Sequence, residues 1–232
     1  MLWEINSCTK ASECYPKQLC AVSSAPEILY YMGDISLCNS VVIAVIGKRD
    51  AEERYLRIAE RVGSIVAQEG YTVLNGLAIG CDTKALEGAI AEGGKVIAVM
   101  PGGLDEIYPK SNRILAEKIL ECGGCLVSEY PCGVRPQKFT FIQRDRIQAM
   151  LAQKVLVIEA EKDGGTMHTA TFAKKLQKPL GCFSEKSGGQ TPIGNQFLLD
   201  NHLADAVCDT DDLKDFVSRP EVKHKQMSLF DV

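Results

Sequence analysis

The sequence lacks a membrane-spanning stretch, a secretory signal and an overall basic character. Its longest apolar runs, such as Val41–Ile46, are far shorter than the roughly 20 residues that a transmembrane helix needs. The amino terminus has no charged start followed by an apolar stretch, so we expect a cytoplasmic protein with no membrane partner. Because 26 basic residues are outnumbered by 30 acidic ones, binding to nucleic acid would require a local basic cluster.

Cysteine is frequent, but it lacks the spacing of a metal site or a disulfide framework. The chain has ten cysteines and three histidines, and Cys122 and Cys125 form its only Cys-x-x-Cys pair. One such pair supplies half of the ligands of a structural zinc site. In a reducing cytoplasm the thiols are expected to stay free. We therefore predict neither a metal site nor a cofactor.

Two common nucleotide-binding motifs, GxGxxG and GxxxxGK[ST], are also missing, which disfavours ordinary dinucleotide and ATP sites. From residue 41 onward, short apolar runs instead alternate with amphipathic segments. The predicted strands are Val41–Ile46, Tyr71–Leu74, Lys95–Met100, Cys125–Val127, Val155–Ile158 and Pro179–Phe183. The predicted helices include Ala51–Glu69, Thr83–Ala91, Asn112–Leu120 and Thr166–Leu176. This alternation predicts an α/β domain with a doubly wound, mostly parallel sheet that is covered on both faces.

Turn residues and composition divide the chain into three parts. Residues 1–40 are predicted to form a helical lead-in packed on the core, because their apolar pattern is shorter and weaker than that of the central residues. Residues 41–217 form the α/β domain. Residues 218–232 become polar after Pro220 and are predicted to form a flexible tail.

Glycine-rich turns come after four of the predicted strands. They are Gly47-Lys48-Arg49, Gly76-Leu77-Ala78-Ile79-Gly80, Pro101-Gly102-Gly103 and Asp163-Gly164-Gly165-Thr166. In doubly wound sheets, ligands bind beside the carboxyl ends of the strands, where glycine and helix amino termini bring backbone amides close to an anion. Glycine also serves tight turns that bind nothing. Four such turns at one edge favour a phosphate-binding rim that includes Gly47, Gly76, Gly80, Gly164, Gly165 and Thr166.

A local basic cluster does exist, in residues 133–154. It holds five basic residues against one acid, a net charge of +4 within a chain of −4. Phe139 and Phe141 lie inside it, and aromatic rings among basic side chains are typical of single-stranded nucleic-acid binding. Alternatively, both rings belong to the core and the basic residues form a solvated helix face. From their alternating spacing we expect at least one of the two rings to be buried.

Taken in order, the loops resemble a known family. The motifs that carry the resemblance are Tyr15-Pro16, Leu29-Tyr30, Ala44-Val45-Ile46-Gly47-Lys48-Arg49, Asn75-Gly76-Leu77-Ala78-Ile79-Gly80-Cys81-Asp82, Tyr108-Pro109, Ser128-Glu129, Gln143-Arg144-Asp145-Arg146, Glu159-Ala160 and Gly164-Gly165-Thr166. Together they span roughly residues 14–208. The sequence is similar to the DNA-processing protein A (DprA, or Smf) family, whose wider superfamily includes the LOG nucleotide phosphoribohydrolases.

The resemblance implies an extended Rossmann-like domain that binds single-stranded DNA at the strand ends without catalysing a reaction. It also implies a homodimer and a recombinase partner during natural transformation. Carried over by position, the implied phosphate contacts are Gly47, Lys48, Arg49, Lys138, Phe141, Arg144 and Arg146. Three positions depart from the family pattern: Lys48 replaces a serine, Leu86 a histidine and Asp145 an asparagine. Only the core of the longer family members is matched.

A second hypothesis is a nucleotide-derivative sensor or a phosphoribohydrolase related to the LOG family. Asp105 and Glu106 form a carboxylate pair of the kind used in glycosidic cleavage, although acids at such positions more often begin a helix. Glu159 ends a strand, and His168 comes after a glycine-rich loop. We regard catalysis as the weaker hypothesis and predict no catalytic residues.

The carboxyl-terminal tail contains one further motif. Lys225-Gln226-Met227-Ser228-Leu229-Phe230 resembles the short peptides that dock on the replicative sliding clamp. Such peptides present apolar anchors to a preformed groove, and here Gln226, Met227, Leu229 and Phe230 would make those contacts. Alternatively, the same apolar residues fold back onto the domain.

Overall fold

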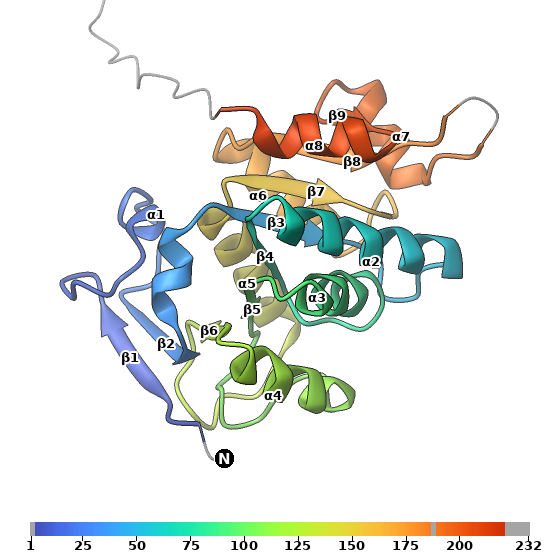
Figure 1. Ribbon diagram of the computed structural model, residues 1–232. Coiled ribbons are helices and arrows are strands. Elements are labelled where there is room, and N and C mark those ends of the chain that lie inside the picture. Colours follow the sequence, from blue (N-terminus) through green and yellow to red (C-terminus); the bar gives the residue numbers. More distant parts are fainter. Residues whose placement is uncertain (1–2, 187–188, 221–232) are drawn as a thin grey trace, which may run out of the picture.

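The computed structural model describes residues 3–186 and 189–220, which are built around one nine-stranded sheet (Figure 1). The strands are β1 (Asn6–Thr9), β2 (Ile28–Gly33), β3 (Val42–Ile46), β4 (Thr72–Asn75), β5 (Val96–Val99), β6 (Cys125–Ser128), β7 (Lys154–Val157), β8 (Leu180–Phe183) and β9 (Asp205–Val207). The helices are α1 (Lys17–Cys20), α2 (Glu53–Gln68), α3 (Cys81–Ala91), α4 (Arg113–Glu121), α5 (Lys138–Leu151), α6 (Thr166–Lys175), α7 (Ile193–Asp200) and α8 (Thr210–Ser218), with short 3₁₀ turns at Ile35–Asn39 and Lys110–Asn112.

The strand order makes the sheet doubly wound. It runs β1-β2-β6-β5-β4-β3-β7-β8-β9, and all neighbours from β6 to β9 are parallel. After β3 the chain builds outward through β4, β5 and β6, and it then returns to the other side of β3 with β7. This reversal places a crevice between the ends of β3 and β7, where ligands bind in such folds. The predicted fold class is confirmed.

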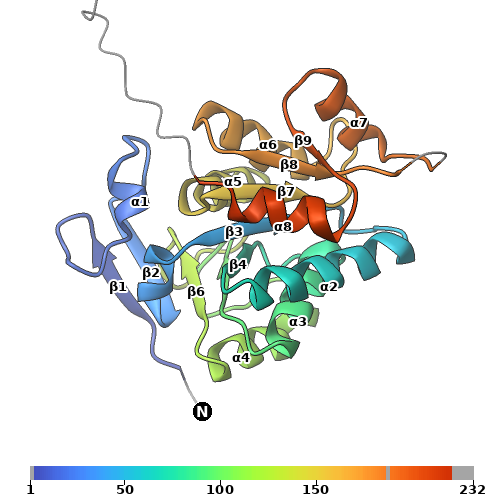
Figure 2. The ribbon, with the colours of Figure 1, turned by 45° about the horizontal axis from the view of Figure 1, so that its top comes forward.

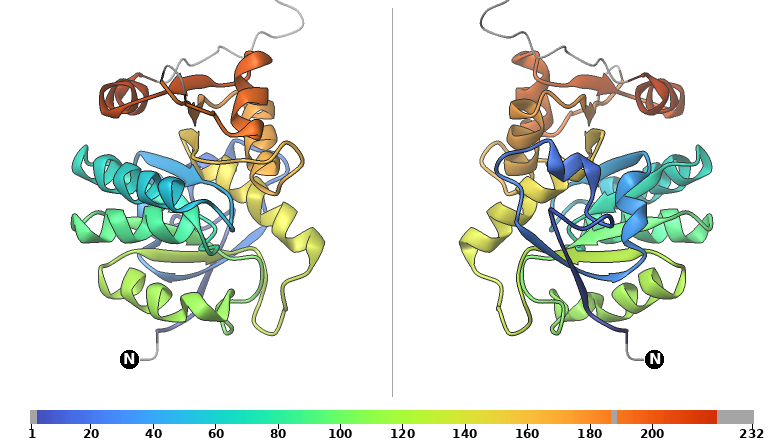
Figure 3. Two further views of the ribbon diagram at one scale, coloured as in Figure 1. Left: turned by 90° about the vertical axis from the view of Figure 1, so that its right-hand side faces the viewer. Right: turned by 90° about the vertical axis from the view of Figure 1, so that its left-hand side faces the viewer.

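Helices cover both faces of the sheet, as continuous apolar strands require. Figure 3 shows α2, α3 and α4 on one face and α5 and α6 on the other. Alternate residues of each strand supply the two cores: Ile43 and Val45 of β3 face the α2 side, and Val42 and Ala44 face the α5 side. Helix α8 packs beside α2, as Figure 2 also shows.

The amino-terminal segment differs from the helical lead-in expected for residues 1–40. It does pack on the core, through buried side chains such as Leu19 and Leu29. However, its main elements are the strands β1 and β2, which extend the sheet antiparallel to β6. The expectation was wrong because these two strands show little alternation in polarity: β2 buries Leu29 alone of its six residues.

Toward the carboxyl terminus, the short strand β9 lies in sequence between α7 and α8. No helix in the described residues is both long and apolar enough to cross a membrane.

Candidate nucleic-acid interface

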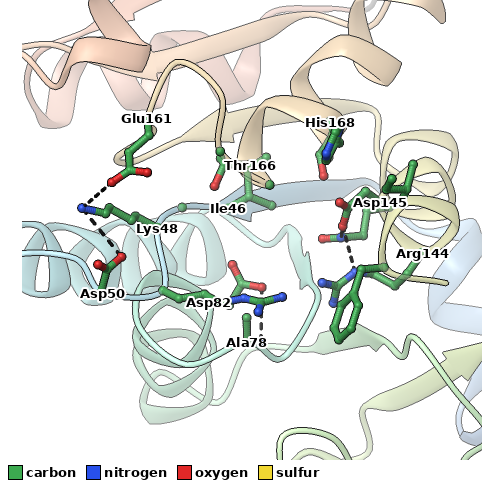
Figure 4. A pocket seen from close by; sticks show the side chains of 18 of the residues that line it. Ile46, Lys48, Asp50, Ala78, Asp82, Arg144, Asp145, Glu161, Thr166 and His168 are labelled. Carbon is green, nitrogen blue, oxygen red and sulfur yellow. Dashed lines mark hydrogen bonds and ion pairs between the residues drawn. The ribbon is translucent and has the colours of Figure 1, made fainter. Parts of the chain in front are cut away.

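A cavity of about 450 Å³ lies at the reversal point of the sheet. Its walls are the β3–α2 loop, the β4–α3 loop, α5, the β7–α6 loop and the first turn of α6. The structure brings together there the following sequence-predicted residues: Gly47, Lys48, Arg49, Lys138, Phe141, Arg144, Gly164, Gly165 and Thr166. Figure 4 shows how side chains from these separate loops converge on it.

Phe141 forms an aromatic lip at the cavity mouth. The Arg49 guanidinium carbon lies 5.1 Å from the centre of its ring, and Tyr108 meets the ring edge-on at 5.5 Å between centroids. Lys138, one helical turn before Phe141 on α5, is exposed at the same mouth. Within the described part of the chain, neither Arg49 nor Lys138 forms an ion pair. Two cations therefore flank one half-buried ring.

Lys48 is held differently from its neighbour Arg49. Its ammonium group lies 2.9 Å from a Glu161 oxygen and 3.7 Å from an Asp50 oxygen (Figure 4). The hydrogen bond to Glu161 is the main reason that the pKa of Lys48 is raised. Much of the positive charge that Lys48 adds to the loop is therefore balanced locally by carboxylates.

Arg144 forms the floor of the cavity rather than its rim. Its Nη1 donates to the carbonyls of Gly76, at 2.6 Å, and Val99, at 3.2 Å, and its Nε donates to Asp145 at 2.9 Å. Arg144 and Asp145 are 5% and 6% exposed. Burial raises the pKa of Asp145, and the Arg144 charge opposes that effect. Arg144 thus connects α5 to the ends of β4 and β5.

Asp82 organises the glycine-rich β4–α3 loop. Its carboxylate accepts hydrogen bonds from the amides of Gly76 and Ala78, at 3.0 and 3.3 Å. Burial raises the pKa of Asp82 to about 6, although Arg144 and the two amides favour its charged form. Because these two amides already serve Asp82, they are not free to bind a phosphate, whereas the contact expected at Gly80 stays a prediction.

Three of the loop glycines allow close packing. A Cβ at Gly76 would overlap the Arg144 guanidinium, one at Gly47 would lie 2.5 Å from the Cβ of Cys81, and one at Gly80 would lie 2.5 Å from the Lys48 carbonyl oxygen. Gly80 also has φ of +85°, which L-residues rarely adopt. It positions the Lys48–Arg49 loop without lining the cavity itself. The exposed Gly165, in contrast, has no atom within 4 Å of a built Cβ.

Two basic residues of the 133–154 cluster lie elsewhere, and one of them, Arg146, is an implied phosphate contact. Arg146 donates to the Ser24 carbonyl and to Glu129, at 2.7 Å for the carboxylate, and so ties α5 to the amino-terminal segment. Lys154 is buried and donates to the carbonyls that end α8. Successive helical residues are 100° apart, so Arg144 and Arg146 face different partners. The basic residues of 133–154 therefore do not form one continuous DNA-binding face.

The phenylalanine expectation was also wrong. Phe139 is 55% exposed and Phe141 is half-buried, so neither ring is in the core. Both lie in the first turn of α5, ahead of the buried segment of that helix. Alternating spacing predicts which residues are buried only in a strand, and these two residues lie at the beginning of a helix.

The carboxylates of the catalytic hypothesis lie away from the cavity or apart from one another. Both oxygens of Asp105 accept from the Gly133 amide, and Glu106 pairs with Lys110. Glu159 is buried, which raises its pKa, and it is not among the cavity-lining residues. His168 does line the cavity. These acids therefore form no pair across the site.

Sequence reasoning missed several cavity residues, including Asp82, Gln148, Glu161 and Thr169. The sequence could have predicted Gln148 as a cavity residue, because it lies one helical turn after Asp145 on the same face of the helix. The clamp-binding candidates Gln226, Met227, Leu229 and Phe230 lie outside the described residues.

Comparisons with known proteins identify the family. The sequence model of the family described as DNA recombination-mediator protein A matches residues 6–218. Protein Smf of Escherichia coli is 39% identical over 192 residues, covering 81% of this chain and 50% of that protein. DNA processing protein DprA of Streptococcus pneumoniae is 38% identical over 161 residues, covering 69% of this chain and 56% of its own. The chain thus spans about half the length of these relatives.

Solved structures agree with this family. DprA of Streptococcus pneumoniae superposes with a TM-score of 0.83 at 31% identity, covering 91% of this chain and 74% of that one. DNA processing protein A of Helicobacter pylori, whose structure addresses its single-stranded DNA binding mode, gives 0.81 at 26%, covering 93% and 94%. A molybdenum cofactor binding protein of Rippkaea orientalis, at 18% identity and a TM-score of 0.56, shares the fold alone. The matched family model, the curated relatives and the superpositions lead to one conclusion: this chain belongs to the DNA recombination-mediator protein A family.

Proposed function

We propose that the chain binds single-stranded DNA in the cavity at the reversal point and that it catalyses no reaction there. The observation that supports this most is the mouth of the cavity, where Arg49 and Lys138 flank Phe141. Cations beside an accessible ring are the combination that single strands need, since phosphates and unstacked bases alternate along them. The Helicobacter pylori relative, which shares this fold, binds single-stranded DNA.

Each wall of the cavity has a definite role in this proposal. Arg49 and Lys138 hold phosphates, and Phe141 contacts a base. The amino terminus of α6, at Gly165 and Thr166, presents unsatisfied backbone amides to the same cavity, and helix amino termini favour anions. Lys48 stays paired with Glu161 and fixes the distance between the first and last loops.

The test is fluorescence anisotropy of a labelled oligo-dT over a salt series. We compare the wild type with Arg49→Gln, Lys138→Gln and Lys118→Gln; the last removes the same charge from an exposed lysine of α4 outside the cavity. Each cavity substitution should weaken binding and lower the log–log salt slope by about 0.7, the value expected per phosphate contact on a single strand. Lys118→Gln should leave both unchanged. Equal slopes for all four proteins would refute the cavity as the binding site.

Hydrolysis of a nucleotide glycosidic bond is the alternative that the cavity supports less well. It needs two carboxylates on opposite sides of one bond, whereas Asp105 and Glu106 are engaged outside this cavity. Incubation with nucleoside monophosphates and detection of free base by chromatography would reveal it. Release of base at a rate that depends on a cavity residue would contradict a purely binding role.

The partners implied by the family resemblance, and the clamp suggested by the tail motif, remain proposals. A homodimer would place two cavities along one strand, and light scattering at several concentrations measures it. A recombinase partner is tested by measuring whether this protein co-sediments with single-stranded DNA that is coated with the recombinase. For the sliding clamp, we propose docking through Gln226, Met227, Leu229 and Phe230, and substitution of Leu229 and Phe230 by alanine should abolish binding in a titration against the clamp.

A further inference from the structure

The inner end of the cavity carries two hydrogen-bond acceptors that are not satisfied. Asp145 and Gln148 lie one turn apart on α5, are 6% and 2% exposed, and both line the cavity. Oδ1 of Asp145 accepts from Arg144 Nε, at 2.9 Å, and from Gln148 Nε2, at 3.0 Å. Its second oxygen, Oδ2, accepts no hydrogen bond from the described residues. Figure 4 shows Asp145 between His168 and Arg144.

The orientation of the Gln148 amide is fixed by its neighbour. A carboxylate only accepts hydrogen bonds, so the amide nitrogen of Gln148 must face Asp145. The amide oxygen, Oε1, is then left buried with no hydrogen-bond partner among the described residues. Buried polar atoms are usually paired, and an exception needs an explanation. A ligand that donates hydrogen bonds would supply one.

Most of the nearby donors of α5 are already used. The Arg144 Nη1 is held by two carbonyls, and the Arg144 Nε and Gln148 Nε2 are held by Asp145. The free acceptors that α5 offers here are Oδ2 of Asp145 and Oε1 of Gln148. Phe141, on the same helix, provides an apolar surface at the lip. This is a polar floor beneath an aromatic edge, which suits an inserted nucleobase.

The four bases differ in what they offer to two acceptors. Guanine carries two adjacent donors, N1–H and the N2 amino group. Cytosine and adenine carry one amino group beside a ring nitrogen that accepts. Thymine carries one N–H between two carbonyl oxygens, which a carboxylate repels. Guanine alone presents donors on two adjacent atoms of one edge, one for each free acceptor.

Building on the proposed binding of single strands, we propose that the cavity floor selects guanine, whose N1–H and N2 amino group donate to Asp145 Oδ2 and Gln148 Oε1. The phosphates on either side of that base are held by the unselective cations of the mouth. The protein thus binds the phosphate backbone of any single strand and preferentially places a guanine in the cavity.

The test measures affinity for oligo-dT that carries one central dG, dI, dA, dC or dT, a design in which a single guanine forms no quadruplex. The dG oligonucleotide should bind roughly 10- to 100-fold more tightly than all-dT, the discrimination typical of one paired recognition of a base edge. Hypoxanthine retains N1–H but lacks the N2 amino group, so dI should lie between dG and dT. This series uses the unaltered protein and needs no variant to fold.

Two variants then locate the selection. Asp145→Asn replaces one acceptor oxygen with a donor and should remove the dG preference, so that the dG and all-dT oligonucleotides bind this variant with equal affinity. Asp50→Asn makes the same change on an exposed carboxylate at the cavity mouth and should keep the preference. Thermal melts of both variants test whether they fold.

The outcomes separate the two proposals. Equal, salt-sensitive affinity for all five oligonucleotides overturns guanine selection and leaves single-strand binding intact. A dG preference that survives in folded Asp145→Asn overturns the assignment to this floor. No binding of any oligonucleotide at low salt overturns both proposals.

Discussion

Replacing Gly76 by alanine should destabilise the protein strongly, because Gly76 makes room for Arg144. The new Cβ would overlap Nη1 and Cζ of Arg144 and would lie 2.8 Å from Nη2. A flexible exposed arginine would simply move away. This guanidinium is buried and is held by the Gly76 and Val99 carbonyls and by Asp145, so moving it breaks those bonds.

The magnitude depends on the interactions that are lost. Hydrogen bonds to a charged group contribute about 1.5–3 kcal/mol each, and breaking a buried ion pair costs about 3–5 kcal/mol. These contributions overlap because they share one side chain, so we expect a loss of about 3–5 kcal/mol in the free energy of unfolding. For a chain of this size, that corresponds to a fall of roughly 10 °C in the melting temperature.

Urea denaturation followed by circular dichroism measures this loss, with Gly165→Ala as the matched control. Gly165 has right-handed helical backbone angles and open space around a built Cβ, so alanine there should be neutral or slightly stabilising. A loss below about 1 kcal/mol for Gly76→Ala would refute the packing argument. If such a variant also bound DNA more weakly, Gly76 would instead belong to the phosphate rim.

Three further predictions concern the site and its supports. The pKa of Asp82 in the folded state, about 6, exceeds its ordinary value of 3.8. The folded state therefore binds the Asp82 proton more tightly than the unfolded state does, and the stability that this proton contributes is lost as pH rises. Between pH 4 and pH 6.5 the free energy of unfolding of the wild type should therefore fall by about 2 kcal/mol relative to Asp82→Asn, as urea titrations at each pH would show; parallel pH profiles would contradict this. Arg146→Ala should lower stability by about 1–3 kcal/mol, because Glu129 loses its partner, yet should change DNA affinity less than twofold; a large affinity loss in a folded variant would return Arg146 to the binding site. Phe141→Leu should weaken oligo-dT binding by roughly tenfold or more through lost stacking. Phe139→Leu, at an exposed ring outside the cavity, should not weaken binding; equal affinities of the two variants in anisotropy titrations would exclude a role of Phe141 in DNA binding.

The loop order along the chain was sufficient to locate the site. Apolar runs alternating with helices predicted the doubly wound sheet, and the carboxyl ends of parallel strands necessarily lie at one edge. Gly47, Gly164 and Gly165 were therefore expected at the same edge, and they line one cavity. That inference needed only the strand positions, which apolar periodicity predicts well.

The roles of individual residues within the site were much less predictable. Charge composition grouped Arg144, Arg146 and Lys154 with Lys138, but they face the cavity floor, the amino-terminal segment and the end of α8 respectively. The sequence records that a residue is basic. It does not record which carbonyl or carboxylate lies within hydrogen-bond distance of it.

Periodicity and the order of motifs were enough to predict the fold class, the family and the edge of the sheet at which the site lies, because both are local properties of the chain. The tertiary structure alone decided which cations are free, which glycines serve packing and which acceptors face the cavity. Those properties depend on contacts between residues far apart in sequence, such as Gly76 with Arg144 or Lys48 with Glu161. Such contacts exist only after the strands have assembled and the side chains have packed.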